Sequence, residues 1–172
     1  MYIRKTRPEE AETVATIFDH GRSIQRATGN HDQWNNGYPN VAVVLDDIAK
    51  NESYVCVSDA TELDLFPTET LLATFCLQKG IDPTYVNIDG AWLNEEPYVT
   101  IHRVSTNGKL KGVGRQAIEW VMQHNDNIRI DTHEKNTPMR RLVDSLGFTY
   151  CGIIYLADGS PRLAYQFLNP LK

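Results

Sequence analysis

The sequence predicts a layered α/β (α+β) fold in which helices cover a central sheet. Strand-like and helix-like apolar runs alternate along the chain, and the last two strand-like runs flank an Asp158-Gly159 turn that favours a hairpin. The chain has 172 residues, of which 41% are hydrophobic and 23% are charged. This length favours one domain over residues 1–172, and the composition is that of an ordinary globular protein.

The first half of the chain opens with a strand and an amphipathic helix. Tyr2–Lys5 alternates apolar and basic residues, as a half-buried strand does. Thr6 and Glu9 fit a capping box for a helix that ends near Arg26 and carries its apolar residues on one face. A turn-rich segment follows at 28–40. A second helix is then expected at Val41–Lys50, and strands at Tyr54–Ser58 and Leu71–Gln78, with a polar loop around Pro67 between them.

The second half of the chain alternates more regularly. Asp82–Pro97 is interpreted as a long connection that carries aromatic residues, and no regular element is expected there. The expected strands are Tyr98–Ser105, Ile128–Thr132, Thr149–Tyr155 and Leu163–Leu168, and the expected helices are Gly112–Gln123 and Pro138–Leu146.

Composition argues against several classes of protein. The net charge of −5 disfavours nucleic acid or an anionic membrane as a partner, and no apolar run approaches the length of about 20 residues that a spanning helix needs. No apolar segment follows the basic start of the chain, so a signal peptide is not expected. Cys56, Cys76 and Cys151 lack CxxC spacing and lie in apolar runs, which predicts buried free thiols and no metal site. A cytoplasmic protein is therefore expected.

The segment Lys109–Arg115, with the sequence KLKGVGR, lies between a predicted strand and a predicted helix. Glycines at a helix start let the backbone approach a ligand, and the free N–H groups there attract anions. The pattern lacks the third glycine of the dinucleotide fingerprint and the GK[ST] ending of a P-loop. The segment predicts either a pyrophosphate site or simply a helix start where Gly112 and Gly114 permit close packing.

The order of elements around this segment resembles the GNAT superfamily of acetyltransferases. That family has a Q/R-x-x-G-x-G/A pyrophosphate loop, and its later helix begins near an Asn and ends in a Gly-Phe pair. Here Lys109, Gly112 and Gly114 match the loop, Asn136 opens the later helix, and Gly147-Phe148 ends it. The likeness covers residues 98–167, whereas the first half agrees only in its order of elements.

The resemblance implies a mixed, mostly antiparallel sheet with splayed central strands, and acetyl-CoA as the acetyl donor. The pyrophosphate would lie on the glycine loop and the pantetheine along the strand before it, with the thioester carbonyl near the Val104 N–H and Asn136 bonded to the pantetheine. The implied cofactor-binding residues are Arg103, Val104, Ser105, Thr106, Lys109, Leu110, Lys111, Gly112, Val113, Gly114, Arg115 and Asn136.

One position departs from the family pattern. A Tyr often stands seven residues after the Asn and protonates the departing thiolate, but this chain has Val143 there. Either another group protonates the thiolate, or the thiolate leaves without help.

Three residues are candidates for the chemistry: His102, Asp131 and His133. A base that titrates near neutrality would deprotonate the amine, and histidine supplies one. Strand alternation would place His102 on the same face as Val104. The same alternation groups Arg129, Asp131 and His133 on one face, either as a charge relay or as an ion pair that orients the strand. His102 has the same alternative, a structural hydrogen bond.

The acceptor site is expected in the turn-rich loop after the first helix. Trp34 and Tyr38 lie there and, together with His102, are the predicted substrate-binding residues, unless the aromatics only pin the loop to the core. Gly159–Arg162 is interpreted as the final hairpin turn, with Arg162 a secondary candidate for contact with an acidic acceptor.

The expected function is transfer of an acetyl group from acetyl-CoA to a small amine by direct attack in a ternary complex. No Cys or Ser is arranged with a base as a nucleophile would be. The alternative is a non-catalytic acetyl-CoA or CoA sensor with the same fold. The Val143 side chain, in place of the Tyr that often protonates the thiolate, favours this alternative. The resemblance also makes a homodimer an expectation.

Overall fold

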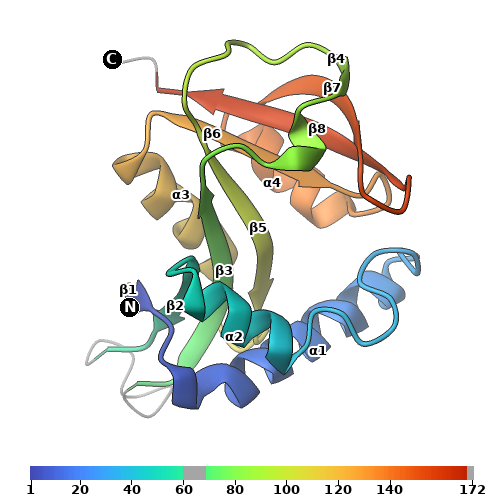
Figure 1. Ribbon diagram of the computed structural model, residues 1–172. Helices are drawn as coiled ribbons and strands as arrows, with labels where there is room; N and C mark the ends of the chain where they lie inside the picture. Colours follow the sequence, from blue (N-terminus) through green and yellow to red (C-terminus); the bar gives the residue numbers. More distant parts are fainter. Residues whose placement is uncertain (60–68, 170–172) are drawn as a thin grey trace.

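The computed structural model describes residues 1–59 and 69–169, and the loop predicted around Pro67 lies outside them. Its strands form one eight-stranded sheet in the order β1-β2-β3-β5-β6-β8-β7-β4 (Figure 1). Neighbouring strands are antiparallel except for β5 and β6, which run parallel. The predicted mixed, mostly antiparallel sheet flanked by helices is confirmed.

The described elements follow the predicted order closely. The strands are β1 (Tyr2–Lys5), β2 (Ser53–Val57), β3 (Leu71–Lys79), β4 (Ile88–Gly90), β5 (Val99–Thr106), β6 (Asn127–Thr132), β7 (Thr149–Tyr155) and β8 (Pro161–Leu168). The helices are α1 (Ala11–Ala27), α2 (Val41–Ala49), α3 (Val113–His124) and α4 (Thr137–Ser145), with 3-10 turns at Pro8–Glu10 and Pro83–Tyr85.

Two predictions about these elements were wrong. The connection over Asp82–Pro97 contains a 3-10 turn and strand β4, which pairs with β7 and is only three residues long. The helix start is also displaced: the Thr6 hydroxyl bonds Ser53, while the Arg7 N–H donates to the Glu10 carboxylate at 2.8 Å. The carboxylate three residues after the cap therefore serves Arg7 rather than Thr6.

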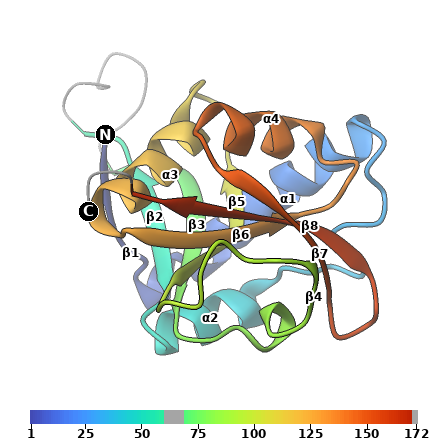
Figure 2. The ribbon, with the colours of Figure 1, turned by 90° about the horizontal axis from the view of Figure 1, so that it is seen from above.

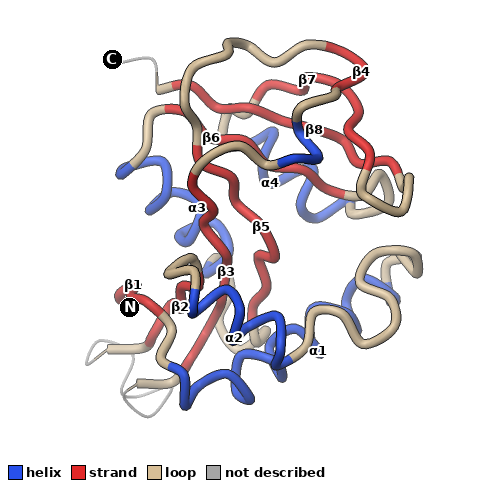
Figure 3. Tube along the Cα trace, in the orientation of Figure 1, coloured by secondary structure: helices blue, strands red, loops and turns tan. Residues whose placement is uncertain are grey.

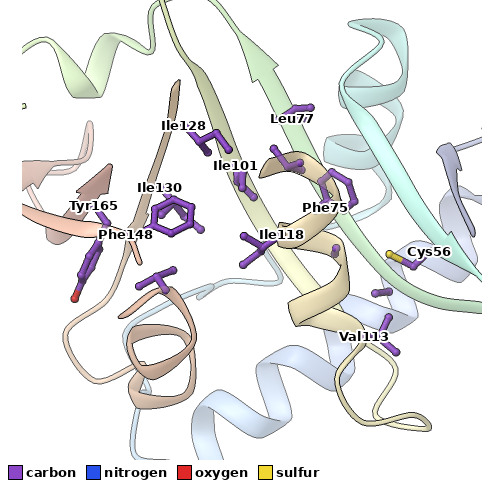
Figure 4. Close-up of a cluster of buried hydrophobic side chains, with 14 of the residues drawn as sticks. Cys56, Phe75, Leu77, Ile101, Val113, Ile118, Ile128, Ile130, Phe148 and Tyr165 are labelled. Atoms are coloured by element: carbon purple, nitrogen blue, oxygen red, sulfur yellow. The ribbon is translucent and has the colours of Figure 1, made fainter. Parts of the chain in front are cut away.

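Helices cover both faces of the sheet (Figure 2). Helices α3 and α4 pack on one face, where Ile101 and Ile118 are part of the main buried cluster (Figure 4). Helices α1 and α2 pack on the other face, against Val55 and Val57 of β2. Cys56, which lies between those two valines, belongs to the α3 side, as strand alternation requires.

The sheet opens in its centre. β5 and β6 pair only over Val99–Ile101 and Ile128–Ile130, and both strands then continue without pairing to each other. Figure 3 shows the two strands diverging from their shared end. The predicted splay is confirmed, and it creates a gap that only side chains from other elements or a ligand can fill.

A bulge in β5 lies at the point where the strands part. His102 pairs with Cys76 and Ser105 with Thr74, so two residues of β5 face Phe75 alone. Arg103 has a φ of 54°, in the left-handed region that is rare for a non-glycine residue. The extra residue changes which side chains of β5 share a face.

Candidate active site

Two adjoining cavities, of about 260 Å³ and about 180 Å³, lie along the splay. The larger is enclosed by β5, β6, the start of β8, the loop after α1 and the loop after β3. The narrower lies between α1, β5 and α4 and extends to the start of α3. Their shared wall is formed by Gln25, Trp34, Val104, Asn136 and Met139.

The narrower cavity is lined by several of the predicted cofactor-binding residues: Val104, Ser105, Thr106, Gly114 and Asn136. At its α3 end the helix is capped by Gly112, whose φ of 85° is left-handed, and no side chain caps the helix. By helix geometry the N–H groups of the first turn have no partner within α3. This end of the cavity therefore offers backbone donors to an anion.

The remaining loop residues divide by role. Lys109 and Lys111 are exposed beside this helix start, so they add positive charge that a ligand could reach. Leu110 packs against the core and Val113 is buried in it. Arg115 bonds Glu119 and Ser145. The predicted close packing at Gly112 and Gly114 is not found, since a Cβ at Gly112 would meet nothing within 4 Å and one at Gly114 would make an ordinary 3.6 Å contact with Thr106.

Helix α1 approaches β5 closely at Gly21. A Cβ built at Gly21 would overlap the Ser105 Oγ and lie 3.0 Å from the Trp34 ring. The Ser105 hydroxyl itself donates to the carbonyl of Ile17 at 2.9 Å. A residue without a side chain at position 21 thus sets the width of the narrower cavity.

His102 is held by Asp82, which follows β3. The His102 Nε2 lies 2.8 Å from the Asp82 Oδ2, and the other oxygen of Asp82 accepts bonds from the N–H and hydroxyl of Thr84. Burial alone would raise the pKa of Asp82, but the bonds from His102 and Thr84 outweigh it and lower that pKa to about 2. Asp82 is therefore an ionised acceptor that orients the imidazole.

Asp131 faces His102 from the opposite side. Its Oδ1 lies 3.8 Å from the His102 Nδ1 and accepts a 2.7 Å bond from the Tyr85 hydroxyl. Burial, together with the neighbouring Asp131, raises the pKa of Tyr85, so the hydroxyl stays protonated and donates. His102 consequently lies between two carboxylates at the wall of the larger cavity.

The bulge contradicts the predicted pairing of side chains on β5. His102 and Val104 do not share a face: Ile101 is buried in the α3 cluster, so His102 after it faces the other side of the sheet, whereas Val104 packs toward the α3 cluster. Both His102 and Val104 nevertheless line the larger cavity, because it opens across the strand where the sheet splays. Alternation failed here because one extra residue shifts the pattern.

The predicted group on β6 is only partly brought to the cavity. Arg129 lies over the rings of Trp92 and Tyr98 at 4.1 and 3.9 Å, which is a structural role. Asp131 lines the larger cavity, but His133 is not among the lining residues. Its Nδ1 accepts from the Lys135 N–H, and burial followed by the charge of Arg162 lowers the pKa of His133.

The predicted aromatic loop forms part of the cavity wall. Trp34 lines both cavities and also packs edge-on against Phe18, with ring centroids 5.5 Å apart. Tyr38 lines the larger cavity, and its hydroxyl accepts a 3.1 Å bond from Arg103. The loop is thus pinned to the core and still contributes to the site. Asn136, which caps α4, donates to Gln33 of the same loop at 3.2 Å.

Arg103 turns toward α2 and forms a two-pronged ion pair with Asp47, at 2.6 and 3.1 Å. Asp47, Glu52 and Cys76 lie close enough together to share a metal ion. They fit one poorly, because Asp47 is already neutralised and burial raises the pKa of Cys76 to about 12. Any contact between Arg103 and a cofactor would therefore come from its backbone.

The position of Val143 and the state of the cysteines limit the chemistry. Val143 is fully buried in the main core cluster, so nothing at that position reaches either cavity. Cys56, Cys76 and Cys151 are buried free thiols, as predicted, and burial raises the pKa of each. None of the three is a ready thiolate at neutral pH.

Replacing Asp82 with Asn is expected to remove a pH-dependent part of the stability. Asp82 has a folded pKa of about 2, below its unfolded value of about 3.9, so its contribution is complete above about pH 5 and is lost as the pH falls toward 2. We expect a loss of about 2 kcal/mol at pH 7 that shrinks as the pH falls. Urea unfolding of both proteins from pH 3 to pH 7 measures this, and a pH-independent difference would contradict it.

Sequence reasoning missed Asp82, Tyr85 and Asp47 as parts of the site. Asp82 and Tyr85 lie in the connection for which no element was expected, although Asp82-Pro83 is a typical start of a short helical turn. Nothing local indicates Asp47, whose role arises from the packing of α2 against β5.

In the described ranges, no helix combines the length and apolar character required to cross a membrane.

Comparisons with known proteins agree with this geometry. No family model matches the sequence, and a search of curated proteins found no significant match. Among solved structures, a GNAT-family acetyltransferase from Streptococcus agalactiae is 30% identical, with a TM-score of 0.85 over 98% of this chain and 95% of that chain. A GNAT-family acetyltransferase from Listeria monocytogenes is 17% identical, with a TM-score of 0.69 over 97% and 94%.

A ribosomal-protein-alanine N-acetyltransferase from Brucella melitensis is 13% identical, with a TM-score of 0.62 over 98% of this chain and 99% of that chain. The last two likenesses show the fold alone. The match to the Streptococcus agalactiae protein covers nearly the whole of both chains, so this chain belongs to the GNAT family of acetyltransferases.

Proposed function

We propose that this protein transfers the acetyl group of acetyl-CoA directly to a small amine in a ternary complex. The observation that carries the proposal is the meeting of the two cavities at Val104, beside the oriented imidazole of His102. The narrower cavity suits a cofactor whose anionic group lies at the start of α3. The larger cavity, which His102 lines, suits the acceptor. Direct transfer needs both ligands in contact, which this arrangement provides.

Acetyl-CoA would occupy the narrower cavity. Its pyrophosphate would accept bonds from the N–H groups at the start of α3, with Lys109 and Lys111 adding charge. Its pantetheine would pass along β5 beside Ser105, Thr106 and Asn136, where β6 has moved away. The thioester would then reach the junction at Val104, whose N–H would stabilise the developing oxyanion.

His102 would act as the base for the acceptor ammonium. Because the ionised Asp82 accepts from Nε2, the neutral imidazole keeps its lone pair on Nδ1. That atom faces Asp131 across 3.8 Å, a separation that leaves the lone pair available to an incoming N–H. Asp131 would stabilise the ammonium before it loses its proton and the imidazolium afterwards. His133 would influence this site only from outside the cavity.

The thiolate of CoA would leave without a protein acid. Among the described residues that line the narrower cavity there is no Tyr, His, Lys or Cys. The thiolate is the conjugate base of a weak acid, so it is a tolerable leaving group. Burial keeps the three cysteines protonated, so none of them supplies the thiolate that a covalent acyl-enzyme would need. This favours direct attack by the amine.

The first test is thermal unfolding with millimolar acetyl-CoA, CoA, ATP or NAD. A ligand at about 100 times its dissociation constant stabilises by roughly 2.7 kcal/mol, which raises the melting temperature by roughly 5–11 °C for this size. We expect that rise with acetyl-CoA and CoA, and none with ATP or NAD. No rise with acetyl-CoA would refute the cofactor assignment.

Gly114 offers a matched variant for this test. A Cβ at this helical position would make an ordinary 3.6 Å contact with the Thr106 side chain. Gly114→Ala should therefore fold normally. Gly114→Leu also introduces a residue that favours a helix, but the longer side chain would project into the narrower cavity. We expect Gly114→Leu to keep its melting temperature without ligand and lose the rise with acetyl-CoA. Binding of CoA without release of thiol to any amine would instead establish a sensor.

A further inference from the structure

The larger cavity holds two arginines in different electrostatic states. Arg103 is neutralised by the two-pronged pair with Asp47 and also donates to the Tyr38 hydroxyl. Arg162, at the start of β8, has no such partner. Its Nη1 donates to the carbonyl of Pro161 at 2.8 Å, and no carboxylate in residues 1–59 or 69–169 lies within 4 Å of it.

Arg162 is deeply placed despite its charge. The residue is only 7% exposed and lines the larger cavity. Its charge acts on neighbouring groups: burial lowers the pKa of His133 most, and the positive charge of Arg162 lowers it further. A buried guanidinium is costly unless a counter-charge or several acceptors meet it. Among the described residues the hydrogen-bond acceptor is the Pro161 carbonyl, and Asp158 in the adjoining turn interacts with the charge without forming an ion pair within 4 Å. The cavity side of the guanidinium is therefore open to an anion.

The same cavity also carries negative charge, and part of it is close to Arg162, because Asp131 on β6 pairs with Ala164, two residues after Arg162 on β8. Asp82 and Asp131 both line the cavity, on either side of His102. His102 belongs to β5 and Arg162 to β8, with β6 between them in the sheet. Two strand spacings are about 10 Å, and the splay between β5 and β6 widens this. The long Arg162 side chain and the His102 ring both extend into the cavity and take up part of this distance. A small molecule with an amine and an anion a few bonds apart can therefore contact both residues.

We propose that the acceptor is a free amino acid, whose carboxylate pairs with Arg162 while its amine lies at His102. This inference rests on the proposed function and names the substrate class of the same site. The pair would be bidentate and desolvated, a geometry that arginine favours with carboxylates. The cavity of about 260 Å³ is large enough for such a molecule.

The test compares each amino acid with the amine that lacks only its carboxylate: phenylalanine with phenethylamine, and lysine with cadaverine. Thiol release gives kcat/KM for each acceptor in the wild type and in Arg162→Gln, Arg162→Lys and Arg141→Gln. Arg141 is exposed on α4 and lines neither cavity, so it serves as the matched control. The melting temperature with CoA, with and without each amino acid, reports acceptor binding without chemistry.

We expect the wild type to prefer at least one amino acid over its amine. Arg162→Gln should lower kcat/KM for that amino acid by at least about 30-fold and leave the amine unchanged, while Arg162→Lys restores part of the loss. Equal rates with amino acids and amines, or an equal loss for both in Arg162→Gln, would overturn the inference and leave the proposed function standing. Without turnover, a melting rise from an amino acid that Arg162→Gln abolishes still supports the subsite, and no rise overturns it.

Discussion

Replacing His102 with Gln is expected to lower kcat for acetyl transfer by about 100- to 10,000-fold, the range for loss of a general base. Glutamine keeps a donor for the Asp82 carboxylate but cannot accept a proton from the ammonium. The loss should appear mainly in kcat, with the rise in melting temperature caused by acetyl-CoA preserved. Thiol release at saturating acetyl-CoA and amine measures kcat.

His124 provides the control for this substitution. It is exposed on α3, packs against the tilted ring of Trp120 and lines neither cavity, so His124→Gln should leave kcat unchanged. Asp82→Asn should fall between the wild type and His102→Gln, because the imidazole remains but its orientation weakens. A His102→Gln enzyme with wild-type kcat would show that the amine loses its proton elsewhere and that His102 is structural.

The largest expected loss of stability comes from Asp47→Ala. This change leaves the Arg103 guanidinium, whose side chain is 17% exposed, without its counter-charge. Breaking one partner of a buried ion pair costs about 3–5 kcal/mol, which lowers the melting temperature by roughly 6–20 °C for a chain of this length. Urea and thermal unfolding at neutral pH measure both quantities.

A second variant separates the pair from the packing around it. Asp47→Leu combined with Arg103→Met removes both charges and keeps most of the volume, so it should recover much of the stability that Asp47→Ala loses. Equal destabilisation by the single and double variants would contradict the role of the charge pair. It would place the cost in packing between α2 and β5 instead.

The fold was largely predictable because its elements carry strong local patterns. The apolar stripe of Val113, Ala117, Ile118 and Val121 predicts α3, and all four side chains are buried on one face. Strand β4 could not be predicted in this way, since Ile88–Gly90 has too few residues for alternation to show. It exists because β7 offers an edge to pair with.

The site was predictable where it depends on backbone and unpredictable where it depends on long-range packing. Gly112 marks the helix start because only glycine readily takes the left-handed conformation there. The bulge at Arg103 has no such marker, so alternation on β5 gave the wrong partner for His102. Asp82 lies 20 residues from His102 in sequence, and only the folded loop brings them together.

A single-turnover experiment with isotopically labelled acetyl-CoA tests the central claim most directly. Protein in excess over the labelled cofactor is mixed with an amino acid, the reaction is quenched at intervals, and label is measured on the protein and on the amine. Direct transfer predicts that label appears on the amine in one phase and never on the protein. Label that accumulates first on the protein, or that reaches no amine although acetyl-CoA binds, would contradict it.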